Sequence, residues 1–237
     1  MRLDKFLSET GSCTRSEASK AARCGKISVN GAAVERADIH IDPEKDVITF
    51  SGKRIEYKKF TYIMLNKPDG FVSATEDSRG EHTVLELLGE RERRLGLFPC
   101  GRLDKNTFGL LILTNDGELC HMLLSPKRHV PKVYRFSCER GVTDSDKERL
   151  ESGIELDGAL TKPVKLTLSE DRHSGTIEIT EGKFHQIKRM FEAVCNKIVY
   201  LERVSFAGIA LDESLPRGEW RELSSEEEAV LLSKKGN

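Results

Sequence analysis

The sequence predicts an α+β protein in which a small N-terminal module precedes a larger domain with a mixed, largely antiparallel sheet flanked by helices. Three observations support this prediction. The 237 residues suffice for one large or two modest domains. Residues 1–59 contain two helical patterns followed by short strands. From residue 60 onward, strand patterns alternate with helical patterns.

Two short helices are predicted at the start of the N-terminal module. Leu3, Phe6 and Leu7 have the spacing of one helical face. Thr14 and the glutamate three residues later match a capping box that opens the second helix, and Gly25 ends this helix. Short strands are then expected over residues 26–29, 32–34 and 46–50, with a turn at residues 30–31.

Seven strands and five helices are predicted in the larger domain, residues 60–237. The strand patterns cover residues 62–66, 71–75, 110–114, 132–138, 164–169, 176–180 and 199–206. The helical patterns cover residues 84–88, 118–124, 144–152, 185–194 and 226–232. A hinge between the two domains is expected within residues 51–60, which hold several Lys and Arg residues and few large apolar ones.

The composition favours a cytoplasmic protein without metal or membrane. No apolar run approaches the roughly 20 residues that a bilayer requires, and the N-terminus carries charges where a secretory signal needs an apolar stretch. The six cysteines are scattered, with no C-x-x-C pair and no histidine cluster at ligand spacing. Cys100, directly before a glycine turn, has no evident base beside it, so a buried thiol is expected there.

Charge is distributed unevenly, although the net charge is only -1. Basic residues outnumber acidic ones in residues 1–30, and a second basic run lies between Lys127 and Arg135. Acidic residues gather at 38–46 and 222–228. Two faces of opposite sign would suit a polyanionic partner on one of them. Taken alone, these runs favour an ordinary solvated surface.

Residues 101–117, GRLDKNTFGLLILTNDG, are the most informative segment. Gly101 permits a tight turn, Arg102 supplies a positive charge, and a continuous apolar strand over 110–113 ends at the polar residues 115–117. Asp104 is therefore displayed beside a rigid strand. This pattern makes Asp104 the candidate reactive carboxylate.

This segment resembles the nucleophile motif of RNA pseudouridine synthases, in the branch that joins an S4 RNA-binding domain to a catalytic domain and modifies ribosomal RNA. Residues 2–34, RLDKFLSETGSCTRSEASKAARCGKISVNGAAV, resemble the S4 domain. The resemblance extends through nearly the whole chain. It implies a small N-terminal S4 domain over residues 1–59 and a pseudouridine synthase catalytic domain over residues 60–237. The RNA contacts expected in the first domain are Arg2, Lys5, Arg15, Ser16, Lys20, Arg23, Lys26 and Asn30.

The implied reaction breaks the bond between N1 of uracil and C1′ of ribose and rejoins the base through C5, with no cofactor expected. Asp104 can attack covalently or stabilise positive charge on the sugar, as carboxylates do in glycosidases. Attack at C1′, attack at C6 and a glycal intermediate all remain open. Arg102 is expected to orient Asp104 or to fill the gap left by the flipped nucleotide.

The resemblance assigns further roles. Tyr134, within KVYR, is expected to stack on the uracil or to help remove the C5 proton. Lys67, in the turn NKPDG, is expected to shape the cleft and contact RNA. In EGKFHQIKRMF, Lys188 is expected to pair with Asp104 and keep it ionised, while His185 and Arg189 meet RNA or solvent.

Helical spacing places Phe184, Ile187, Phe191 and Val194 on one predicted core stripe. The chain also departs from the family pattern beside the turn: Asn106 replaces a frequent Asp, and Phe108 replaces a small or hydroxyl residue. Neither change removes a catalytic group.

Members of the family that modify small-subunit (16S) rRNA resemble this chain most in residues 160–163 and 184–191. The expected partner is thus ribosomal RNA or a partly assembled ribosomal subunit. Two alternatives are the same reaction on 23S rRNA and a catalytically inactive, ribosome-associated RNA-binding protein. Because no heptad seam calls for self-association, a monomer is expected.

Overall fold

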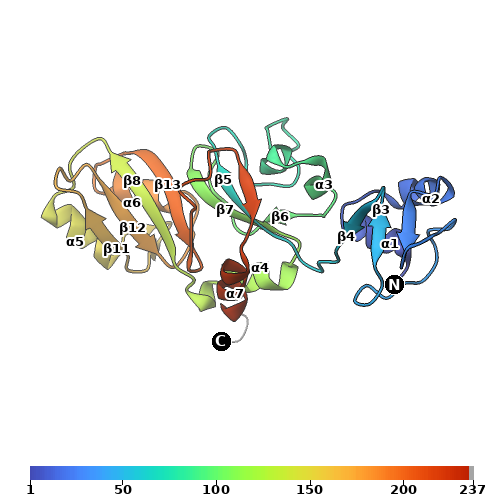
Figure 1. Ribbon diagram of the computed structural model, residues 1–237. Coiled ribbons are helices and arrows are strands. Elements are labelled where there is room, and N and C mark those ends of the chain that lie inside the picture. The colour runs from blue at the N-terminus through green and yellow to red at the C-terminus, as the bar shows by residue number, and fades with distance from the viewer. Residues whose placement is uncertain (235–237) are drawn as a thin grey trace. The chain divides into compact units, whose positions relative to one another are not determined.

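The computed structural model describes residues 1–234 and divides into two compact units (Figure 1). The first unit comprises Met1–Thr61 and Leu85–Phe98, and the second comprises Tyr62–Val84 and the chain from Pro99 onward. The last three residues of the expected 60–237 domain lie outside the described range. Within residues 1–234, none of the helices has the length and apolar character needed to span a bilayer.

Two helices open the first unit, as the sequence predicts: α1 (Leu3–Glu9) and α2 (Arg15–Arg23). The expected capping box is confirmed, because Thr14 Oγ1 accepts from the Glu17 N–H at 3.2 Å while Glu17 Oε2 accepts from the Thr14 N–H at 2.7 Å. Gly25 follows the end of α2 with φ +66°, a conformation that favours glycine. One face of both helices is buried in the core of this unit.

A four-stranded antiparallel sheet completes the N-terminal module, in the order β2-β1-β3-β4. Its strands are β1 (Ile27–Val29), β2 (Ala32–Ala33), β3 (Ile48–Phe50) and β4 (Lys53–Ile55). The predicted hinge over 51–60 is wrong in part, since it contains β4. Ser51 and Gly52 both have positive φ, which is the geometry of a two-residue hairpin turn, and the basic residues of β4 occupy a sheet edge.

Residues 85–98 cluster with the N-terminal module rather than with the rest of residues 60–237. They follow the 3₁₀ helix η1 (Val84–Leu87) and contain α3 (Glu90–Arg93). Arg91 Nε donates to Thr10 O at 3.4 Å. Gly11 has φ +70°, and a Cβ there would lie 2.6 Å from Arg91 O, so a glycine is required at this contact.

The second unit is built on one mixed sheet in the order β11-β12-β8-β13-β7-β5-β15 (Figure 1). Only β13 and β7 run parallel; the other neighbours in this order are antiparallel. The predicted α+β class with a largely antiparallel sheet is confirmed. The strands are β5 (Tyr62–Lys67), β7 (Phe108–Thr114), β8 (Lys132–Cys138), β11 (Lys165–Leu168), β12 (Ser174–Ile179), β13 (Ile198–Phe206) and β15 (Trp220–Glu222).

Helices and shorter strands surround this sheet. The helices are α4 (Gly117–Leu124), η2 (Pro126–Arg128), α5 (Asp144–Ser152), α6 (Gln186–Ala193) and α7 (Ser225–Ser233). The shorter strands are β6 (Phe98–Pro99), the hairpin partners β9 (Glu155–Leu156) and β10 (Ala159–Leu160), and β14 (Ile209–Ala210), which pairs with β13. The predicted helix 84–88 is therefore a 3₁₀ turn, whereas the predicted helix 144–152 is confirmed.

The predicted strand 71–75 is wrong. This segment makes a single β-bridge, between Val72 and Thr83, and is otherwise irregular. The side chain of Ser73 explains its course, because Ser73 Oγ donates to Leu103 O at 2.9 Å and accepts from the Leu103 N–H at 3.0 Å. The segment thus supports the loop before Asp104 instead of extending the sheet.

Gly109 lets β7 and β13 approach closely. It has φ +95°, and a Cβ there would lie 2.3 Å from Arg203 O and 2.8 Å from Glu202 Cγ. Any larger residue would force the two parallel strands apart. This glycine therefore fixes the distance between the turn that precedes β7 and the side chains of β13.

Candidate active site

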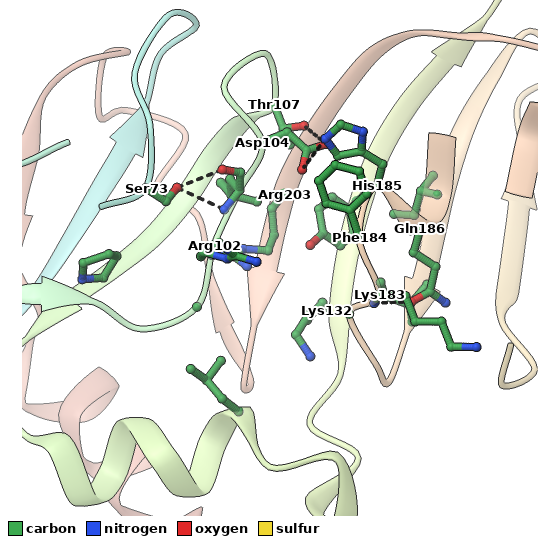
Figure 2. A pocket seen from close by; sticks show the side chains of 18 of the residues that line it. Ser73, Arg102, Asp104, Thr107, Lys132, Lys183, Phe184, His185, Gln186 and Arg203 are labelled. Atoms are coloured by element: carbon green, nitrogen blue, oxygen red, sulfur yellow. Dashed lines mark hydrogen bonds and ion pairs between the residues drawn. The ribbon is translucent and has the colours of Figure 1, made fainter. Parts of the chain in front are cut away.

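A cleft of about 940 Å³ lies entirely within the second unit (Figure 2). Its walls come from the Asp104 turn, the start of β8, the segment leading into α6, and β13. Seven Lys and Arg side chains and four carboxylates line it, so the cleft carries a positive excess that suits a polyanion.

Asp104 lies in this cleft at a turn that begins with Gly101, whose φ is +88°. Its side chain is 27% exposed, which leaves the carboxylate accessible to a ligand. The predicted ion pair is present, since Lys188 Nζ lies 2.8 Å from Asp104 Oδ2. His185 Nε2 lies 3.7 Å from Oδ1, and Thr107 Oγ1 donates to Oδ2 at 3.5 Å (Figure 2).

Lys188 bridges two side chains of the turn. Besides Asp104, its ammonium donates to Asn106 Oδ1 at 2.6 Å. Asparagine accepts this hydrogen bond without adding a second negative charge, so Asp104 is the anion that the ammonium neutralises. The departure from the family pattern at Asn106 therefore preserves the position of Lys188.

The burial of Lys67 does not favour the RNA contact predicted for it. The residue is 0% exposed, because it ends β5 beneath the Asp104 turn. Its ammonium donates to the carbonyl oxygens of Pro68, Asp104, Lys105 and Thr107 at 3.0–3.1 Å. Burial lowers the pKa of Lys67 to about 8, although Asp69 and Asp104 oppose this shift. Lys67 is thus a scaffold for the turn.

Tyr134 and Arg102 also line the cleft. Tyr134 is 7% exposed and belongs to β8, where its backbone pairs with Ile177 and Arg203. Arg102 is exposed, and within residues 1–234 its guanidinium has no hydrogen-bond or ion-pair partner. No contact between Arg102 and Asp104 supports the expectation that Arg102 orients the carboxylate. The guanidinium of Arg102 is instead free to contact a nucleotide.

The segment before α6 departs from the predicted core stripe. Ile187, Phe191 and Val194 are buried as expected, but Phe184 is 69% exposed. The helix begins only at Gln186, because His185 adopts a left-handed conformation with φ +48°. Phe184 therefore leaves the helical face and stacks on the His185 ring at the edge of the cleft, with ring centroids 3.8 Å apart.

Arg189 is less available to RNA than predicted. Its guanidinium makes a bidentate pair with Asp157, with N–O distances of 2.8 and 2.6 Å, and its side chain is 26% exposed. This pair ties α6 to the turn between β9 and β10. The structure thus gives Arg189 a role within the protein.

The predicted RNA-binding residues of the first unit lie on its surface. Exposed side chains are those of Arg2, Lys5, Arg15, Ser16, Lys20, Arg23, Lys26 and Asn30. Arg2 and Lys5 pair with Asp4 and Glu9, respectively. Asn30 uses both ends of its amide inside the protein, with Asp46 Oδ1 and the Val47 N–H, so it fixes the hairpin turn rather than offering its amide to RNA.

No metal cluster accompanies this cleft: in residues 1–234, no three His, Cys, Asp or Glu side chains are grouped as metal ligands. Cys100 is buried next to Cys120, and its pKa is raised by a hydrogen bond with Cys120 and by burial. The raised pKa disfavours the thiolate, which is the reactive form of cysteine.

A family model described as RNA pseudouridylate synthase matches residues 61–193, more than half of the chain. The chain belongs to this family. A second model, described as the S4 domain, matches residues 1–48. The protein therefore combines an S4 domain with a pseudouridine synthase fold, and it is a pseudouridine synthase by family, as the sequence predicts.

Similar proteins cover nearly the whole chain. An uncharacterized RNA pseudouridine synthase of Bacillus subtilis (strain 168) is 44% identical over 235 residues, covering 98% of each chain. Ribosomal small subunit pseudouridine synthase A of Escherichia coli (strain K12) is 38% identical over 235 residues, covering 98% of this chain and all of the relative. A crystal structure of a pseudouridylate synthase aligns with TM-score 0.68 at 37% identity, over 98% of this chain and 99% of that one.

Proposed function

We propose that this pseudouridine synthase isomerises a specific uridine of 16S (small-subunit) rRNA with the carboxylate of Asp104. The observation that carries the proposal is the accessible Asp104 carboxylate in a positively charged cleft, 2.8 Å from the ammonium of Lys188. The name of the Escherichia coli relative, which covers 98% of this chain, supports the small subunit as the source of the RNA.

In the proposed reaction the target uridine leaves its stack and enters the cleft. Asp104 acts on the sugar or on the base as the C1′–N1 bond breaks, and the ion pair with Lys188 holds the carboxylate in the cleft. Tyr134 offers a ring to stack on uracil and a hydroxyl near the C5 proton. Arg102, which is free of protein partners within residues 1–234, fills the space that the flipped nucleotide vacates.

Residues 1–59 are proposed to bind rRNA through exposed basic residues and residues 60–237 to carry catalysis. Phosphate and shape readout by Arg15, Lys20, Arg23 and Lys26 would position the RNA without reading its sequence. We further propose a monomer that needs no cofactor and acts in the cytoplasm, where ribosomal subunits are assembled.

A site-resolved map of pseudouridine in both ribosomal RNAs tests this proposal. The map would compare the parent strain with a strain that lacks this protein. Loss of one pseudouridine from 16S rRNA is the expected result. Loss from 23S rRNA instead would reassign the substrate, and identical maps together with retained RNA binding would favour an inactive RNA-binding protein.

A further inference from the structure

Arg203 is a buried cation that the roles proposed so far leave unused. It lies on β13, is 1% exposed and lines the cleft together with Lys132 (Figure 2). Tyr134 lines the same cleft. Its Nε donates to Leu110 O at 2.7 Å, and its guanidinium stacks on the Phe206 ring at 4.9 Å. Its Nη2 is buried and has no hydrogen-bond partner.

No carboxylate compensates this charge: within residues 1–234, no Asp or Glu oxygen lies within 4.0 Å of the Arg203 guanidinium. A second cation lies nearby instead, since Lys132 Nζ also lies over the Phe206 ring, 5.8 Å from its centroid. Burial, and after it the charge of Arg203, lower the pKa of Lys132 to about 8. Burying a charge without a counter-ion is costly, and so is burying a donor without an acceptor. This pair of cations is therefore prepared to receive an anionic group with oxygen acceptors.

The position of Arg203 indicates which part of a nucleotide it would meet. Its backbone pairs with that of Tyr134 on β8 and with that of Gly109 on β7, the strand that follows the Asp104 turn. Gly109 allows β7 and β13 to lie this close together, since a Cβ at residue 109 would lie 2.3 Å from Arg203 O. Arg203 is 1% exposed, whereas the phosphates of a flipped nucleotide stay on the solvated backbone. The part of the nucleotide that would reach Arg203 inside the cleft is therefore the base.

We propose that Arg203, assisted by Lys132, stabilises the uracil anion that forms when the C1′–N1 bond breaks. This role rests on the proposed isomerisation. The electron pair of the broken bond stays with the base, where it is spread over N1, O2 and O4, and the sugar carbon is compensated by Asp104. Conjugation also places part of this charge on C5, which then forms the C1′–C5 bond; the C5 proton leaves to a base, and N1 takes up a proton, so that the product is neutral. A preorganised cation aimed at the developing charge accelerates the first of these steps.

The experiment compares uridine with 5-fluorouridine at the target position, in single-turnover reactions of wild type and Arg203→Met. Fluorine at C5 withdraws electrons and stabilises the uracil anion, so this substrate needs less help from the protein. Liquid chromatography separates the isomeric nucleosides of the digested RNA, and mass spectrometry then identifies them, which gives the rate at which each product forms. We expect Arg203→Met to slow the uridine reaction by about 100-fold or more and the 5-fluorouridine reaction by far less. Affinity for RNA should stay within about twofold.

Arg217→Met is the matched control, because Arg217 also stacks on a phenylalanine, 4.3 Å from the Phe108 ring centroid, but does not line the cleft. It should react with both substrates as wild type does. If Arg203→Met fails to fold, judged by thermal melting, Lys132→Met replaces it and should show the same contrast between substrates at smaller amplitude.

An equal loss of rate on both substrates would show that Arg203 is only structural and would overturn this inference. A defect confined to RNA affinity would overturn it too, and would point to a phosphate as the bound anion. Wild-type protein that forms no pseudouridine would instead contradict the proposed function, which distinguishes the two failures.

Discussion

At the residue scale, the turn that carries Asp104 depends on side chains from outside the turn. The ammonium of Lys67 donates to three carbonyl oxygens of residues 104–107 from below, and Ser73 fixes both backbone groups of Leu103. Lys188 holds the carboxylate and Asn106 from the side. Three separate segments therefore determine where a single carboxylate lies.

Replacing Lys67 by methionine should destabilise the second unit. Four carbonyl oxygens around the fully buried ammonium would lose a charged donor, which costs about 3–5 kcal/mol. Urea unfolding followed by the fluorescence of Trp220, the single tryptophan, measures this change. Lys105→Met is the control, because Lys105 makes an exposed pair with Glu81 and should cost under about 1 kcal/mol. Equal stability of Lys67→Met and wild type would contradict the scaffold role.

Phe184 is the exposed aromatic residue at the edge of the cleft. Because it is 69% exposed, Phe184→Ala should leave stability unchanged, but it should weaken RNA binding by about 1–3 kcal/mol if a base stacks on the ring. Fluorescence anisotropy with a labelled rRNA fragment measures the affinity. Val199→Ala, which shortens another exposed apolar side chain away from the cleft, should bind RNA normally. Unaltered affinity of Phe184→Ala would rule out the stacking contact.

At the element scale, strongly patterned segments could be predicted from the sequence and weakly patterned ones could not. The predicted strand 132–138 and the predicted helix 144–152 are confirmed residue by residue. Residues 71–75 are apolar enough for a strand, but Ser73 binds the Leu103 backbone instead, a tertiary contact that no local pattern contains. The helical spacing at Phe184 was misleading because the left-handed His185 delays the start of α6.

Arg221 joins β15 to α7 and to the loop before β15. It contacts Asp212 at 2.8 Å and Glu227 at 2.7 and 2.8 Å. Hydrogen bonds from Ser214 and then from Arg221 lower the pKa of Asp212 to about 2, and Arg221 is the main cause of the lowered pKa of Glu227. Both carboxylates are therefore anions under neutral conditions.

Acid should destabilise this region through these two groups. Because their pKa values are lower in the folded state, the unfolded chain binds more protons as pH falls from 4 toward 2, and the free energy of unfolding decreases. Arg221→Met removes part of the shift, so its stability should depend less steeply on pH in this window. Urea unfolding of wild type and Arg221→Met at pH 4 and pH 2.5 measures this dependence. An equal loss of unfolding free energy in the two proteins between these pH values would contradict the role of Arg221.

At the scale of the whole molecule, the family and both domains could be predicted from the sequence, because the nucleophile motif and the S4 pattern are local. The ion pair between Asp104 and Lys188 was predicted from the resemblance, and the 2.8 Å contact agrees with it. The burial of Lys67 and the uncompensated charge of Arg203 could not be predicted. They depend on which strands become neighbours, and residues 67, 104 and 203 are far apart in the chain.

The exposed basic residues of the first unit give a prediction about RNA binding. Changing Lys20 and Arg23 together to alanine should weaken RNA binding, since two phosphate contacts are lost. The plot of log affinity against log salt concentration should also become less steep, by about one to two units of slope. The matched control changes Arg36 and Lys45, which are exposed cations next to the acidic residues 38–46. If both double variants lose the same affinity, the proposed RNA-binding face is wrong.

The most direct test of the central claim replaces one oxygen of the Asp104 carboxylate. Asp104→Asn keeps the size of the side chain and an oxygen that can accept from Lys188, but removes the negative charge. Tritium release from C5-labelled uridine in rRNA measures isomerisation, and anisotropy measures affinity. We predict no isomerisation above background, with RNA affinity within about twofold of wild type. Isomerisation by Asp104→Asn at a rate near that of wild type would contradict the account.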